Sequence, residues 1–326
     1  MFLWKKSNEI WARLSKKFEL TILGSGSATP TLNRNPASQI LNVQNHLVLI
    51  DCGEATQLAL RKNKIKFQRI NQIFISHLHG DHYLGLPGLL STFSLLGRTN
   101  PLDIFGPADL EKIINLHFSV SGRIPDYPIR FYQVKTNNKK LIFENKIMLV
   151  WAFPLKHRIE TYGFLFEEKP KLRHINSDAM RKYSIPHYKY NALKQGADYT
   201  IEKTKEIIPN EKLTHSASPS FKYAYCSDTA FFPKITGWIE NADCLFHETT
   251  FMEKDRELAK KTFHSTTIEA AEIAKQAKVG QLIIGHYSAR YLNLELLVEE
   301  CKSIFENTDA ATDGKVFSIL QPGAFR

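Results

Sequence analysis

The stretch His77-Leu-His-Gly-Asp-His82 constrains this chain more than any other feature of its 326 residues. Three histidines and one aspartate fall within six positions, although the whole sequence has only 12 histidines. In an extended segment residues two apart point the same way, so His77 and His79 can bind one metal ion together. The glycine that follows lets the chain turn, so Asp81 and His82 can face a second ion. Because zinc favours imidazole and carboxylate ligands, the stretch predicts a two-zinc hydrolase.

Three more candidate ligands follow apolar segments that predict strands. They are His157, Asp228 and His286. A lone histidine is more often structural than a ligand, but these residues share one kind of place. Open α/β sheets put their sites at the carboxyl ends of strands, which is where these residues would lie.

Apolar strand patterns alternate with helical ones along most of the chain, which favours an α/β layered fold. The pair Thr266 and Glu269 predicts a capping box at the start of a helix that runs to about residue 278. Further helices are expected at 55–62 and 85–96. The strands are expected at 18–23, 47–50, 72–76, 102–105, 221–226, 243–246 and 281–284.

A basic, tyrosine-bearing stretch from about 169 to 215 interrupts this alternation. It has few apolar positions to bury, so we expect an inserted arm within a domain that covers 18–326. The net charge of the chain is +10, and such an excess favours polyanionic partners. Residues 1–17 mix tryptophan and lysine, and we expect a short N-terminal extension there.

The four cysteines form no CxxC pair, which argues against a disulfide framework or a four-cysteine zinc site. This usage fits a reducing cytoplasm, where we expect the protein to act. Apolar runs stay shorter than the roughly 18 residues of a membrane helix, so we expect no membrane partner.

These motifs resemble the metallo-β-lactamase superfamily and, within it, the ribonuclease Z family. The pattern His-x-His-x-Asp-His is that of the superfamily. Other segments are similar to ribonuclease Z motifs: Pro30-Thr-Leu-Asn-Arg-Asn35, His82-Tyr-Leu-Gly-Leu-Pro-Gly-Leu-Leu90, His157-Arg158 with Thr161-Tyr-Gly163, Phe246-His-Glu-Thr-Thr250, His264-Ser-Thr266 and His286-Tyr-Ser-Ala-Arg290-Tyr291.

The resemblance implies a metallo-β-lactamase-type αββα sandwich with a protruding basic arm, two Zn²⁺ per subunit and a homodimer. The first zinc would be held by His77, His79 and His157, and the second by Asp81, His82 and His286. Asp228 would bridge the two ions. Asp51, His247 and Glu248 would support these ligands from behind.

The resemblance also implies an endoribonuclease that removes the 3′ trailer from tRNA precursors and leaves a 3′-hydroxyl. Asp81 would accept a proton, and His264 would hold the scissile phosphate and donate a proton to the leaving oxygen. Arg290 would clamp a phosphate. Arg34 and Asn35 would lie near the 3′ end of the tRNA, and the arm would contact its phosphates.

Two other functions stay open at this point. One is a two-zinc phosphodiesterase or arylsulfatase-type hydrolase for small esters, which the long basic insertion argues against. The other is a nucleic-acid-binding protein with a structural metal site, which the complete set of seven ligands argues against.

Overall fold

The computed structural model describes residues 18–217 and 219–319. The expected N-terminal extension, residues 1–17, lies outside these described residues. The chain forms two compact units, which we call the body (18–167 and 221–319) and the arm unit (168–220).

The first sheet of the body has seven strands in the order β18-β1-β2-β3-β4-β5-β6. Neighbours from β3 to β6 run parallel, and the remaining pairs are antiparallel. The strands are β1 (Phe18–Gly24), β2 (Ser38–Val43), β3 (His46–Cys52), β4 (Ile70–Phe74), β5 (Leu102–Gly106), β6 (Ile129–Gln133) and β18 (Val316–Ser318).

The second sheet also has seven strands, in the order β17-β16-β15-β14-β9-β8-β7. Strands β14 to β17 run parallel, so their carboxyl ends lie at one edge. The strands are β7 (Lys140–Glu144), β8 (Met148–Pro154), β9 (Tyr162–Glu168), β14 (Lys222–Cys226), β15 (Cys244–Glu248), β16 (Leu282–Gly285) and β17 (Thr308–Ala310).

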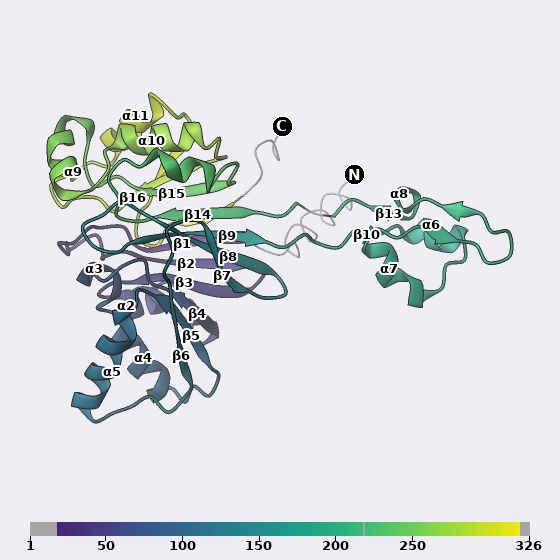
Figure 1. Cartoon of the computed structure of the whole chain (residues 1–326), viewed down its shortest axis with the longest axis horizontal. Coiled ribbons are helices and arrows are strands. Elements are labelled where there is room, and N and C mark those ends of the chain that lie inside the picture. Colours follow the sequence, from purple (N-terminus) through teal and green to yellow (C-terminus); the bar gives the residue numbers. More distant parts are fainter. Residues whose placement is uncertain (1–17, 218, 320–326) are drawn as a thin grey trace. The chain divides into compact units, whose positions relative to one another are not determined.

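Three apolar clusters define the layers. One cluster joins residues of both sheets, such as Ile50 and Tyr225, and forms the core between them. A second packs helices onto the first sheet, and a third packs helices onto the second sheet. The sheets therefore lie face to face between two helical layers, as Figure 1 shows, and the expected αββα sandwich is confirmed.

The helices that cover the first sheet include α4 and α5, and those on the second include α10 and α11. The Thr266 hydroxyl accepts from the Glu269 amide, and the Glu269 side chain binds the Thr266 amide, so the expected capping box is present. The helices of the body are α2 (Thr56–Lys62), α3 (Gly80–Tyr83), α4 (Leu86–Leu95), α5 (Asp109–Ser121), α9 (Arg256–Thr262), α10 (Thr267–Gln276) and α11 (Glu295–Lys302), with short 3₁₀ turns at η1 (Phe67–Arg69), η3 (Pro233–Gly237) and η4 (Glu253–Asp255).

The arm unit has two two-stranded sheets, β10 with β13 and β11 with β12. It also has a small apolar core of its own, which consists of Ala179, Met180, Ile185, Leu193, Ile208 and Leu213. The expectation that this stretch has little to bury was therefore wrong, because its apolar residues are scattered along the chain rather than gathered in runs. Its elements are β10 (His174–Ile175), α6 (Ser177–Lys182), η2 (His187–Lys189), α7 (Tyr190–Lys194), β11 (Tyr199–Thr200), β12 (Ile207–Ile208), α8 (Asn210–Leu213) and β13 (Thr214–His215).

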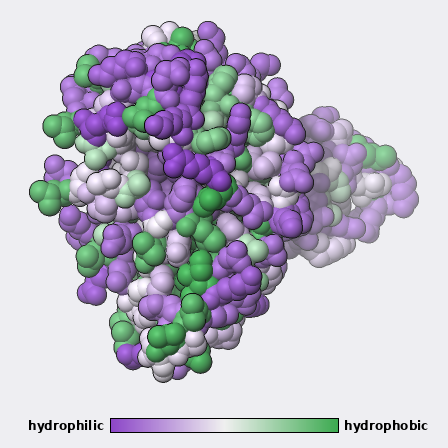
Figure 2. All heavy atoms as spheres, turned by 60° about the vertical axis from the view of Figure 1, so that its left-hand side comes forward, coloured by the Kyte–Doolittle hydropathy of each residue, from purple (hydrophilic) through white to green (hydrophobic). Residues whose placement is uncertain are grey.

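The surface of the body mixes polar and apolar side chains, as Figure 2 shows for one face. Some exposed apolar residues belong to α4, α5 and the segments that follow them. These are Leu95, Leu96, Leu116, Val120 and Ile124. The four cysteines are buried and free. Among the described residues, no helix is long and apolar enough to cross a membrane.

Candidate metal centre

The candidate ligands lie in short segments that follow strands of both sheets. His77 and His79 follow β4, and Asp81 and His82 belong to the single turn of α3. Asp228 comes two residues after β14. The other two ligands are His157, after β8, and His286, directly after β16.

Close backbone packing beside α3 requires glycine at two positions. A Cβ on Gly53 would lie 2.3 Å from the carbonyl oxygen of Asp81, and one on Gly85 would lie 2.0 Å from that of Gly53. The Gly85 amide also donates to the carbonyl oxygen of Cys52. These contacts hold α3 against the end of β3 and so fix the backbone that carries Asp81 and His82.

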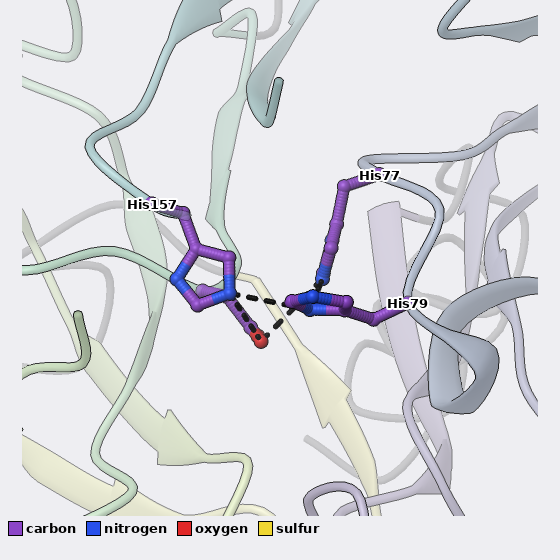
Figure 3. A group of neighbouring side chains, drawn as sticks. His77, His79 and His157 are labelled. Carbon is purple, nitrogen blue, oxygen red and sulfur yellow. Dashed lines mark hydrogen bonds and ion pairs between the residues drawn. The ribbon is translucent and has the colours of Figure 1, made fainter. Parts of the chain in front are cut away.

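The first group of ligand atoms consists of three imidazole nitrogens and one carboxylate oxygen. His79 Nδ1 lies 3.0 Å from His77 Nε2 and 3.2 Å from His157 Nε2. Figure 3 shows the three imidazole rings pointing toward one another from two sides of the site. Asp228 Oδ2 lies 3.5 Å from His77 Nε2 and 3.7 Å from His157 Nε2. The four residues therefore surround one point.

The second group contains Asp81, His82 and His286, with the other oxygen of Asp228. The Nε2 atoms of His82 and His286 are 3.3 Å apart, and each lies 3.3 Å from Asp81 Oδ2. Asp228 Oδ1 lies 3.4 Å from His82 Nε2 and 3.2 Å from His286 Nε2. The carboxylate of Asp228 thus turns one oxygen toward each group.

These separations fit divalent cations. Zinc–nitrogen and zinc–oxygen bonds of about 2.0–2.1 Å in a tetrahedron put ligand atoms about 3.3 Å apart. In two of these histidines the ring nitrogen that faces away from the ligand group has an oxygen partner. His157 Nδ1 donates to the carbonyl oxygen of Phe263 at 2.8 Å. Similarly, His82 Nδ1 lies 2.7 Å from Asp51 Oδ2. A histidine whose Nδ1 carries the hydrogen offers the Nε2 lone pair to a metal ion.

Asp51 lies directly behind His82. Its carboxylate is fully buried and accepts hydrogen bonds from the Ser76 amide and hydroxyl as well as from Tyr225. The backbone of Asp51 is left-handed, with φ of 53°, and so is that of His286, with φ of 61°. This conformation is uncommon for non-glycine residues, although aspartate adopts it more readily than most, and it recurs at functional sites.

Glu248 organises the segment around His264. Its Oε1 accepts from the amides of Thr229 and Ser265 and lies 2.9 Å from His264 Nδ1. Its Oε2 accepts from the amide and the hydroxyl of Thr250. Burial alone would lower the pKa of His264, but the Glu248 carboxylate outweighs it and raises that pKa to about 9.

Several residues of the site were not anticipated from the sequence. Since the Thr250 hydroxyl donates to Glu248, it accepts from His286 Nδ1, 2.9 Å away. Ser76 Oγ lies 3.0 Å from His77 Nδ1, and Ser227 Oγ lies 3.4 Å from Asp228 Oδ1. Ser76 and Ser227 directly precede the candidate ligands His77 and Asp228, and Thr250 ends the segment Phe246-His-Glu-Thr-Thr250; these positions were the available signal.

Buried carboxylates give the centre an excess of negative charge. Burial would raise the pKa of Asp228, but His286 and His82 outweigh it and hold that pKa well below its usual value. Burial lowers the pKa of His77 to about 4, so this ring is neutral near pH 7. Ionised carboxylates beside a neutral imidazole suit a cation.

A cleft with a volume of about 550 Å³ opens over the two groups. His79, Asp81, His157, Asp228, His264 and His286 all line it. Arg290 lies beside the cleft, since its guanidinium packs over Phe251, which lines it, and its side chain is 45% exposed.

Three residues expected at the site make structural contacts. His247 is buried, and its Nδ1 donates to the carbonyl oxygen of Glu248. The Arg34 guanidinium donates to the carbonyl oxygen of Tyr291 at 2.9 Å. The Asn35 amide group donates to the carbonyl oxygen of Leu23. The bonds of Arg34 and Asn35 hold the loop after β1. A role for these two residues at the tRNA 3′ end stays a prediction.

The family models that match the chain are two. The model described as anti-Pycsar protein Apyc1 matches residues 18–169, and the beta-lactamase superfamily domain matches residues 214–287. Each covers less than half of the chain, and the second includes Asp228 and His286.

Curated relatives and a solved structure cover nearly the whole chain. A ribonuclease Z of Bacteroides fragilis is 45% identical over 304 residues, which are 93% of this chain and 100% of the relative. One of Porphyromonas gingivalis is 46% identical over 297 residues, 91% of this chain and 97% of the relative. The crystal structure of human tRNase Z, short form, matches with a TM-score of 0.66 and 27% identity, over 93% of this chain and 99% of the human one. The chain therefore has the metallo-β-lactamase fold and belongs to the ribonuclease Z family.

Proposed function

We propose that this protein is a metal-dependent endoribonuclease that removes the 3′ trailer from tRNA precursors and leaves a 3′-hydroxyl on the tRNA. The observation that carries the proposal is the Asp228 carboxylate, which turns one oxygen to each of two ligand groups at the floor of a cleft. The relatives named ribonuclease Z and the human tRNase Z supply the substrate class.

We assign the ligands of two Zn²⁺ ions as follows. His77, His79 and His157 would hold the first and Asp81, His82 and His286 the second, with Asp228 between them. When bound, two divalent cations at this site lower the pKa of water and offset negative charge on a phosphoryl oxygen.

In this proposal His264 supplies the proton for the leaving oxygen, and the Glu248 carboxylate orients His264. Because His264 Nδ1 donates to Glu248, its Nε2 is the nitrogen that can meet the substrate in the cleft. The Glu248 carboxylate raises the pKa of this imidazole, which favours its protonated form, and keeps the ring oriented. Asp81 Oδ2 contacts His82 and His286. We propose that Asp81 also accepts a proton from the attacking water.

Zinc-loaded protein is expected to cut a 3′-extended tRNA precursor just after the discriminator nucleotide. A chelator should abolish the reaction, added zinc should restore it, and metal analysis should find about two zinc ions per chain. Intact precursor together with efficient hydrolysis of bis(p-nitrophenyl) phosphate would instead favour the small-ester hydrolase.

Substitution of His264 by alanine should lower the rate of precursor cleavage about 10²- to 10⁴-fold, the usual contribution of a general acid. The zinc content should stay at the wild-type value, which separates this effect from loss of a ligand. Single-turnover cleavage and metal analysis measure the two quantities. A substrate with a good leaving group, such as p-nitrophenolate, should be much less affected.

We further propose that the protein acts as a homodimer in the cytoplasm, with the arm unit contacting tRNA phosphates. The exposed apolar residues on and after α4 and α5, Leu116 and Val120 among them, would suit contact between two subunits. The arm unit carries ten Lys and Arg against six Asp and Glu, which suits a polyanion. The mass of the protein in solution tests the dimer.

A further inference from the structure

A buried tyrosine of the second sheet is hydrogen-bonded to Asp51, the residue of the first sheet that lies behind the candidate ligand His82. Tyr225 lies on β14 and is only 1% exposed. Its ring packs in the core between the sheets, stacked on Phe246 with ring centroids 5.2 Å apart. Its hydroxyl donates to Asp51 Oδ2 on β3 at 2.6 Å. The proposed reaction gives this hydroxyl no task.

The contact involves the same carboxylate oxygen that holds His82. Asp51 Oδ2 lies 2.7 Å from His82 Nδ1 and accepts from Ser76 Oγ at 2.8 Å, while Oδ1 accepts from the Ser76 amide. The Tyr225 hydroxyl is therefore one of four donors to this carboxylate, and the one that comes from the second sheet. Burial and the nearby Asp51 carboxylate keep the pKa of Tyr225 well above its usual value, so the hydroxyl stays protonated and can donate.

The same strand also leads to Asp228. Only Cys226 and Ser227 separate Tyr225 from this aspartate. A hydrogen bond from Tyr225 to Asp51 thus ties the end of β14 to the end of β3. One end carries the candidate bridging carboxylate, and the other carries the carboxylate behind His82.

We propose that Tyr225 is a positioning residue for the second cation, because its hydroxyl fixes the Asp51 carboxylate that orients His82 toward Asp81, His286 and Asp228. This inference rests on the two-cation site proposed above. Partners behind a ligand histidine set its tautomer and orientation, and their loss typically weakens metal binding about 10- to 100-fold.

The neighbouring Tyr223 provides a matched control. It lies two residues earlier on β14, so its side chain points to the same face, and it is fully buried in the same core. Its hydroxyl also crosses to the first sheet, where it donates to Gln39 Oε1 on β2. Tyr223→Phe therefore removes an equally buried inter-sheet hydrogen bond that does not end on Asp51.

The experiment is a calorimetric titration of Zn²⁺ into the chelator-treated wild type, Tyr225→Phe and Tyr223→Phe. We expect Tyr225→Phe to bind the second zinc ion about 10-fold more weakly, the lower end of that range, and the first with unchanged affinity. Tyr223→Phe should bind both ions like the wild type. Both variants should lose similar thermal stability, since each loses one buried hydrogen bond.

Unchanged binding by Tyr225→Phe, or equal weakening in both variants, would overturn the inference but leave the two-cation site standing. A wild-type protein that binds fewer than two zinc ions would overturn the site and the inference together. If Tyr225→Phe is only partly folded, the rise of its unfolding temperature with zinc concentration gives the same affinity, because a ligand stabilises the state that binds it.

A second comparison asks whether Tyr225 acts through Asp51. Asp51→Ala should weaken the binding of the second zinc ion more than Tyr225→Phe does. Adding Tyr225→Phe to Asp51→Ala should then change the zinc affinity no further, since the acceptor is already gone. An additional loss in the double variant equal to that of Tyr225→Phe alone would contradict the proposed route.

Discussion

Substitution of Asp228 by alanine is expected to slow precursor cleavage at least about 10³-fold, the scale of removing a residue on which a catalytic site depends as a unit. The reason is geometric, because one Asp228 oxygen faces His77 and His157 and the other faces His82 and His286. Loss of this side chain should therefore weaken the binding of both cations at once. Single-turnover cleavage of a 3′-extended tRNA and metal analysis of the same preparation measure the two effects.

A matched control uses an aspartate that belongs to none of the ligand groups and does not line the cleft. Asp109, at the start of α5, is exposed and pairs with the exposed Lys112 of the same helix. Such surface pairs contribute little, so Asp109→Ala should leave cleavage and zinc content at wild-type values. If Asp228→Ala kept two zinc ions and more than about a tenth of the activity, the bridging position of Asp228 would be wrong.

The candidate ligands could be found in the sequence because each lies close to the end of an apolar strand. Asp228 comes two residues after β14, and His286 comes directly after β16. Strands of this kind are visible as apolar runs, and the short segments after them leave little choice about where the side chains lie. The αββα layering was predictable for the same reason, because strand and helix patterns alternate along the body.

Strand β4 ends where a side chain replaces a backbone partner. Residues 72–76 were expected as a strand, but β4 ends at Phe74. Two residues later the Ser76 amide donates to the Asp51 carboxylate instead of to a neighbouring strand. Nothing local to this segment marks that change, because the acceptor is 25 residues away in the chain.

The supporting contacts of the site were out of reach for a related reason. Glu248 gathers donors from residues 229, 250, 264 and 265, and Tyr225 reaches Asp51 across 174 residues. The Tyr225 bond exists only after the two sheets have packed, whereas the Glu248 bonds need the segments that follow β14 and β15 to come together. The sequence shows which residues could ionise or donate, but the pairing depends on the sandwich.

Removal of the arm unit is expected to lower kcat/KM for a tRNA precursor by about 10²-fold or more, while hydrolysis of bis(p-nitrophenyl) phosphate changes less than about twofold. The structure offers a clean deletion, because Glu167 and Lys222 are directly paired in the antiparallel register of β9 and β14. Replacing residues 169–220 by Asn-Gly would join Glu168 to Phe221 through a two-residue hairpin turn. The small substrate then reports whether the metal centre has survived.

A gentler variant tests the charge of the arm unit without removing its fold. Lys182, Lys203 and Lys205 are exposed, and none of them belongs to its apolar core. Alanine at all three positions should raise KM for the precursor and flatten the dependence of cleavage on salt concentration. The reason is that fewer phosphate contacts form on binding, so fewer counterions are released. Two results would contradict a role of the arm unit in binding tRNA. One is a deletion that slows the cleavage of both substrates equally, and the other is a lysine variant that keeps the wild-type salt dependence. Because the lysine variant leaves the metal ligands intact, a rise in KM at constant kcat would assign the effect to substrate binding rather than to chemistry.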